Sequence, residues 1–118
     1  MLNNWIEQLS NLRRAAGALM TASPKLVTGY QALNAAQNGA GALDAKTREL
    51  IALAVAVTTR CDGCISSHAN AARAAGVTEA ELADALGTAI ALNAGAAYVY
   101  SVRAMEAFGQ FKPEKAAA

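Results

Sequence analysis

One stretch, from Glu49 to His68, constrains this chain more than any other part of its sequence. It reads ELIALAVAVTTRCDGCISSH, an almost uncharged apolar run followed by the only two cysteines and the only histidine of the chain. Wound as a helix, residues 45–59 are apolar nearly all round, which is typical of a buried helix. We therefore expect this segment to be the central helix of the fold.

The remainder of the chain is predicted to be helical scaffold. Apolar residues recur at the three- and four-residue spacing of amphipathic helices, and no strand pattern, internal repeat or second domain is visible. The expected helices span about residues 3–21, 24–37, 45–59, 61–75, 79–92 and from there to about 108. The sequence thus predicts an all-α fold, a single-domain bundle of about six helices over residues 1–111, with a frayed C-terminal tail at 112–118.

Short polar signals set the helix boundaries. Ser23 before Pro24 is a typical N-cap pair, and Asp44 is a good N-cap for the central helix. The segment from Thr78 to Glu81 has the pattern of a capping box, and Gly76 suits a left-handed C-cap. We expect Asn93–Gly95 to interrupt the last helical region.

Composition narrows the class of protein. Hydrophobic residues make up 54% of the 118 residues but aromatic ones only 5%, and much of the apolar content is alanine, which buries little area per residue. Such a domain is expected to complete its core by forming a homo-oligomer. The net charge of +1 comes without a basic cluster, so nucleic acid and anionic membranes are not expected partners.

The same reasoning predicts a cytoplasmic location. The start, MLNNWIEQL, lacks a basic region followed by an apolar one, as a signal peptide would have. The longest uninterrupted apolar run, Leu50–Val57, is far shorter than the roughly 20 residues of a membrane-spanning helix. In the cytosol a close cysteine pair more often indicates redox chemistry or metal binding than a structural disulfide.

The cysteines and the histidine share one side of a predicted helix. At about 100° per residue, Cys61, Cys64 and His68 fall within roughly 60° of one another. Ile65, Ala72 and Ala75 lie on the same stripe, which makes it the inward face. The opposite face, expected to point to water, carries Asp62, Ser66, Asn70 and Arg73.

Glu49 is the carboxylate placed to join them. It lies on an apolar stripe with Ala52, Leu53 and Ala56, where burial disfavours the charged form unless a partner is near. In one straight helix it would be about 18 Å from Cys61. A turn near Thr59–Arg60 with antiparallel helices instead brings Glu49 level with His68. The spatial order would then be Glu49, His68, Cys64, Cys61.

This order suits thiol chemistry with proton transfer. A thiolate is the reactive form of cysteine, and a Cys-X-X-Cys pair in the first turn of a helix favours it. Attack on a peroxide gives a sulfenic acid, which the second thiol converts to a disulfide. His68 or Glu49 could give the leaving alkoxide its proton.

The pattern Glu-X11-Cys-X2-Cys-X3-His resembles the signature of the alkylhydroperoxidase D group within the carboxymuconolactone decarboxylase family. The flanking segments, Asp44–Ile51 and Ala74–Thr78, are also similar to that family. The likeness covers about Leu43 to Asn93 well and the N-terminal helices loosely. One departure is Gly63, at a place where the alkylhydroperoxidase D pattern often has a histidine.

The resemblance implies an all-helical protein that assembles into trimers or trimers of dimers. It implies a peroxidase that uses a dithiol and no metal or flavin cofactor. By position, Cys64 would be the peroxidatic cysteine, Cys61 the resolving one, and Glu49 and His68 the proton relay. The substrate would be a small organic hydroperoxide and the reductant a dithiol, such as a lipoyl-bearing protein.

Other interpretations remain open at this point. The cysteines could be buried structural thiols, or Cys61, Cys64 and His68 could bind zinc with Glu49 as one more donor. Glu49 could instead form an ion pair with Lys46 or Arg48. A non-redox decarboxylase acting on a small lactone or acid, with His68 and Glu49 as acid and base, and a non-catalytic redox-sensing oligomer are the alternative functions.

Overall fold

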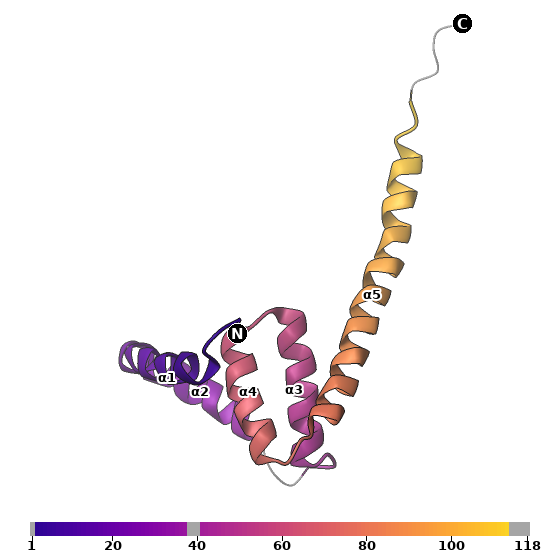
Figure 1. Cartoon of the computed structure of the whole chain (residues 1–118). Helices are drawn as coiled ribbons and strands as arrows, with labels where there is room; N and C mark the ends of the chain where they lie inside the picture. The colour runs from indigo at the N-terminus through magenta and orange to yellow at the C-terminus, as the bar shows by residue number, and fades with distance from the viewer. Residues whose placement is uncertain (1, 38–40, 114–118) are drawn as a thin grey trace, which may run out of the picture.

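A computed structural model of the chain describes residues 2–37 and 41–113, and within them it has five helices and no strand. Figure 1 shows α3 and α4 side by side, with α1 and α2 on one flank and α5 leaving on the other. The helices are α1 (Trp5–Ala22), α2 (Pro24–Ala35), α3 (Ala45–Thr59), α4 (Asp62–Ala74) and α5 (Glu79–Gln110). The all-α, single-domain prediction is therefore confirmed. Residues 114–118 of the predicted tail, and residues 38–40 after the second predicted helix, lie outside the described residues.

The predicted caps explain most helix boundaries. The Asp44 side chain accepts a hydrogen bond from the Thr47 N–H at the start of α3. Thr78 and Glu81 form the reciprocal hydrogen bonds of a capping box at the start of α5. Gly76, after the end of α4, has a positive φ of 84°, which glycine adopts without steric cost. These local signals needed no tertiary information.

The predicted interruption at Asn93–Gly95 is wrong, because α5 continues through it, and the described residues hold five helices where about six were expected. The Asn93 amide donates hydrogen bonds to the Ala89 carbonyl within α5 and to the Thr58 hydroxyl of α3. A glycine inside a helix costs only about 1 kcal/mol, and no proline is present in the segment to force a break. The helix α5 therefore continues through both Asn93 and Gly95, which are only weak helix breakers.

The buried core lies where α3, α4 and the start of α5 meet. It consists of Leu53, Ala72 and Val77, with Leu50, Ala69 and Leu82 packed around them. The central helix α3 contacts both α4 and α5. It is not buried on all sides within one chain, since Ile51 and Val55 remain about half exposed at 49% and 55%.

The outer face of α4 also differs from the prediction. Ser66, expected to face water, is buried, and its hydroxyl donates a hydrogen bond to the Gly63 carbonyl. The reason is α1, which packs across this side of α4. At Gly63 an added Cβ would lie 2.7 Å from the Leu12 side chain, so the missing side chain lets α1 approach closely.

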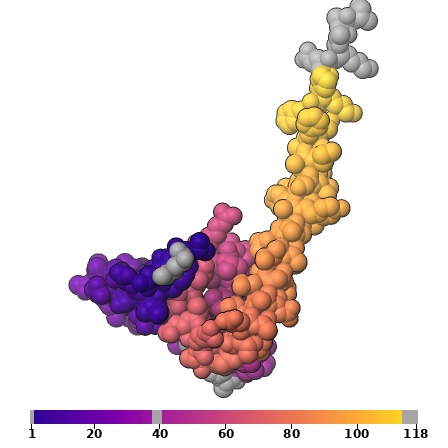
Figure 2. Space-filling view, in the orientation of Figure 1, coloured from indigo at the N-terminus to yellow at the C-terminus, as the bar shows by residue number. Residues whose placement is uncertain are grey.

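The chain is far from compact. Its radius of gyration is 20.9 Å, against about 13 Å for a compact domain of this length. The longest extent, 71 Å, follows α5, whose second half stands clear of the other helices in Figure 2. We define the distal segment of α5 as residues 96–110, all of which are exposed. Its large apolar side chains include Tyr98, Val99, Tyr100, Val102, Met105 and Phe108.

By length and composition, α5 is also long and apolar enough to cross a membrane, the one such helix in the described part of the chain. Core helices of soluble proteins satisfy the same criteria, so this property is weak evidence for a bilayer. The absence of a membrane-spanning helix was expected from the length of uninterrupted apolar runs alone, and it stays a prediction.

Candidate active site

The predicted turn between the two central helices is confirmed. The helix α3 ends at Thr59, and Arg60 adopts the left-handed conformation with φ of 56°. The Cys61 N–H donates to the Ala56 carbonyl at 3.1 Å, which closes the end of α3. The chain then reverses into α4, so that the far end of α3 lies beside the middle of α4.

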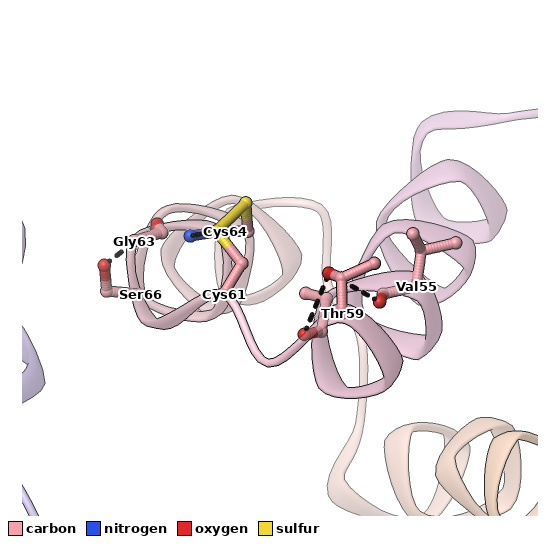
Figure 3. The surroundings of a disulfide bond; sticks show 7 residues. Val55, Thr59, Cys61, Gly63, Cys64 and Ser66 are labelled. Carbon is pink, nitrogen blue, oxygen red and sulfur yellow. Dashed lines mark hydrogen bonds between the residues drawn. A yellow bond between two sulfur atoms is a disulfide. The ribbon is translucent and has the colours of Figure 1, made fainter. Parts of the chain in front are cut away.

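The two cysteines lie at the start of α4 and form a disulfide, with their Cα atoms 5.2 Å apart. Cys61 is the N-cap residue, and its sulfur accepts a hydrogen bond from the Cys64 N–H at 3.1 Å. Figure 3 shows the disulfide at the first turn of α4, beside the end of α3 at Thr59. Both cysteines are partly exposed, so the pair is within reach of solutes. This arrangement is the oxidised form of a dithiol pair.

Glu49 and His68 meet, as the antiparallel arrangement predicts. The Glu49 Oε2 and His68 Nδ1 atoms are 2.7 Å apart, and the two side chains are 15% and 31% exposed. The alternative ion pair with Lys46 is wrong, because Lys46 pairs with Glu81 of α5 at 2.7 Å. With Glu49 ionised, its carboxylate can only accept a hydrogen bond, and this assigns the proton between them to Nδ1 of His68. The other nitrogen, Nε2, is then the one that exchanges protons in the neutral ring.

A cleft of about 380 Å³ gathers these groups. Cys64, His68 and Glu49 line it together, whereas Cys61 is not among the described residues on its wall. Most of the wall is apolar and comes from one face of α3. The other lining residues are Asn34, Gln37, Leu43, Arg48, Ile51, Ala52, Val55, Ala56 and Thr59. The volume is in the range of small-molecule sites.

Sequence reasoning missed the rest of the cleft, above all Arg48, which it considered only as a possible partner of Glu49. A signal was present, because Arg48, Ala52, Val55 and Thr59 recur at helical spacing on α3. The sequence did not show that Asn34, in the last turn of α2, and Gln37, just after that helix, line the same cleft as this stripe.

The structure does not support the alternative of a zinc site. Among residues 2–37 and 41–113, no three or more histidine, cysteine, aspartate and glutamate side chains are grouped to hold a metal ion. The two cysteines are joined to each other, and the carboxylate is hydrogen-bonded to the imidazole. The residues present fit a dithiol pair with an acid–imidazole pair.

Three features together define the class of protein to which this chain belongs. They are an all-helical fold, a Cys-X-X-Cys pair at a helix start, and a glutamate–histidine pair behind it. A model of the "Carboxymuconolactone decarboxylase family" matches residues 24–107, so the chain belongs to that family. This confirms the family resemblance expected from the sequence motif.

Individual relatives agree with this assignment. An uncharacterized protein of Haemophilus influenzae is 59% identical over 108 residues, covering 92% of this chain and 96% of the relative. "Uncharacterized protein 4 in cox locus" of Paracoccus denitrificans is 36% identical over 91 residues, covering 77% and 82%. The crystal structure of apo-lpg0406, a carboxymuconolactone decarboxylase family protein from Legionella pneumophila, superposes with a TM-score of 0.72 at 34% identity. It covers 92% of this chain and 97% of that one.

Proposed function

We propose that the protein is a thiol peroxidase that reduces small organic hydroperoxides through a dithiol–disulfide cycle of Cys61 and Cys64. The observation that carries the proposal is the cleft in which Cys64 of the disulfide lies with the Glu49–His68 pair. A structural thiol pair needs no hydrogen-bonded acid and imidazole on the same cleft wall. A thiol peroxidase can use all three groups, the thiol as nucleophile and the other two for proton transfer.

In the first step, the Cys64 thiolate attacks the terminal oxygen of the hydroperoxide. The O–O bond breaks, Cys64 becomes a sulfenic acid, and the leaving alkoxide takes a proton to form an alcohol. His68 supplies that proton from Nε2, while Glu49 holds the ring and stabilises its charged form at Nδ1. The 2.7 Å hydrogen bond between Glu49 and His68 supports this division of roles.

In the second step, the Cys61 thiol attacks the sulfenic sulfur of Cys64. Water leaves, and the disulfide forms. The positions of the two residues support Cys64 as the peroxidatic cysteine, because it lines the cleft, and Cys61 as the resolving one. A dithiol reductant then returns two electrons and two protons to the pair. The family resemblance suggests a lipoyl-bearing protein for this part.

The proposal includes assembly into a homo-oligomer in the cytoplasm, a trimer or hexamer by family resemblance. Support comes from α5, where Tyr98, Met105 and Phe108 are 77%, 72% and 80% exposed. Contiguous exposed apolar surface of this kind usually marks an interaction surface. Further copies of the chain are the partners that would cover it.

The test is a count of free thiols, with intact mass, before and after a small excess of cumene hydroperoxide is added to the reduced protein. We expect both thiols to disappear, the mass to fall by about 2 Da, and a dithiol to reverse both changes. Thiols that stay free after peroxide would refute the peroxidase and favour the decarboxylase. Unaltered thiols that react only after unfolding would favour the structural interpretation.

A further inference from the structure

The cleft beside Cys64 holds one charged side chain that the reaction does not use, Arg48. Its Nε donates to the Leu43 carbonyl and its Nη1 to the Gln37 side-chain oxygen, each at 3.3 Å. Within residues 2–37 and 41–113, it forms no ion pair with any carboxylate. A guanidinium has five N–H groups, so these two contacts leave donors available.

Gly41 lies directly beside the guanidinium of Arg48. A Cβ at this position would collide with Nη2 of Arg48. The glycine therefore allows the loop before α3 to pass directly over the guanidinium. Gln37, Leu43 and Gly41 together hold a long, flexible side chain at the cleft wall, and such preorganisation favours ligand binding.

The rest of the cleft is suited to an apolar body. Leu43, Ile51 and Val55 supply its larger apolar side chains. On the antiparallel helices, the bond between Glu49 and His68 places Cys64 level with residue 53 of α3. Arg48 therefore lies about 8 Å along the helix axis from the level of Cys64. The cleft thus has a positive group toward one end, an apolar middle and a reactive sulfur.

We propose that Arg48 binds the carboxylate of the substrate, so that the enzyme prefers an organic hydroperoxide with an apolar chain and one carboxylate group. Arginine matches a planar carboxylate with two parallel hydrogen bonds. A single arginine, in a cleft that also holds the Glu49 carboxylate, suits a singly charged group better than a phosphate. This inference rests on the proposed function for the reaction, and on Arg48 alone for the anion.

Binding is measured first, without turnover. Octanoate is titrated into the reduced protein by calorimetry, with octan-1-ol as the neutral probe. We expect octanoate to bind and to slow alkylation of Cys64. Arg48→Gln should weaken octanoate at least tenfold and leave octan-1-ol unchanged, with Arg48→Lys in between. Arg14→Gln, on the exposed side of α1, is the matched control and should bind octanoate normally.

Gly41→Ala is the second variant, because it keeps Arg48 and moves its flexible end. It should weaken octanoate binding while leaving the helical content unchanged. Equal octanoate affinity in the wild type, Arg48→Gln and Arg14→Gln would overturn the proposal. Tighter binding of octyl phosphate than of octanoate would overturn the assignment to a carboxylate.

Kinetics then separate this inference from the peroxidase proposal. With a hydroperoxide of a fatty acid, Arg48→Gln should raise KM at least tenfold with kcat unchanged, and KM for cumene hydroperoxide should not move. Equal KM changes for both peroxides would refute the carboxylate role and leave the peroxidase standing. Arg48-dependent octanoate binding without consumption of either peroxide would refute the peroxidase and leave the carboxylate site standing.

Discussion

In α3 and α4 the functional side chains find partners within one chain, whereas the distal segment of α5 stands clear of the other helices (Figure 2). Glu49 and His68 are hydrogen-bonded at 2.7 Å, and Cys61 and Cys64 are joined. By contrast, all residues from 96 to 110 are exposed. The reactive groups are thus assembled by local chain reversal, while the long helix leaves its large apolar side chains exposed in the described chain.

The largest effect is expected from two negative charges introduced into the distal segment, because they would disrupt the proposed oligomer. Tyr98→Glu combined with Val102→Glu places two carboxylates on one face of α5, one helical turn apart. Each apolar side chain buried in an interface is worth about 1.5–3 kcal/mol, so we expect the assembly to dissociate. Native mass spectrometry or light scattering measures the change. Gln110→Glu, which adds a carboxylate at an already polar position, should leave the mass unchanged. A wild-type monomer would contradict the expectation.

A core substitution sharpens the comparison from the other side. Leu53 is 4% exposed at the centre of the core cluster, and Leu53→Ala should lower the free energy of unfolding by about 2–5 kcal/mol. Leu92 is 72% exposed, so Leu92→Ala should affect stability only where another chain covers it. Denaturant unfolding at several protein concentrations tests this. A large, concentration-independent loss for Leu92→Ala would be inconsistent with the fold.

Glu49→Gln tests whether the local reversal serves catalysis. The amide keeps the shape but cannot stabilise a charged imidazole, so peroxide turnover should fall by roughly 10²-fold and the pH–rate profile should change shape. Glu79→Gln, at the exposed start of α5, is the control and should behave as wild type. An unchanged rate and profile for Glu49→Gln would rule out the proton relay.

The smallest effect concerns two carboxyl groups at the starts of α3 and α5, Asp44 and Glu81. Hydrogen bonds from Thr47 lower the pKa of Asp44, and those from Lys46 and then the Thr78 N–H lower the pKa of Glu81. A carboxyl whose pKa is lower when folded stabilises the fold above its unfolded pKa and loses that contribution as pH falls through its folded pKa. The melting temperature should therefore decline slightly below about pH 4. Glu81→Gln should reduce this decline, and a steeper one in that variant would contradict it.

Much of the site could be predicted because it depends on local features. Residues with strong capping chemistry, such as Asp44 and Thr78, fix the starts of helices α3 and α5. The turn after Thr59 then dictates that Glu49 comes level with His68. The spacing of these residues carries the geometry, which is why the Glu49–His68 contact follows from the sequence.

The remaining features depend on contacts between distant segments. Asn93 looked like a helix breaker, but its side chain donates a hydrogen bond to Thr58, which is 35 residues away in the sequence. Ser66 looked solvent-facing until α1 covered it. Arg48 became a cleft residue because Asn34 and Gln37, far from it in the sequence, line the same cleft. The contacts of Asn93 and Ser66 leave no periodic signal in their own segments, and for Arg48 the helical spacing does not show which distant residues complete the cleft.

We propose above all that the sulfur of Cys64, beside His68 and Glu49, is the atom that reacts with peroxide. The most direct measurement is peptide mass spectrometry of sulfenic acid trapped with dimedone. The Cys61→Ser and Cys64→Ser variants are first reduced, and each then receives one equivalent of cumene hydroperoxide. We predict rapid labelling of Cys64 in Cys61→Ser and almost none in Cys64→Ser. Labelling of Cys61 at a similar or faster rate in Cys64→Ser would contradict the account.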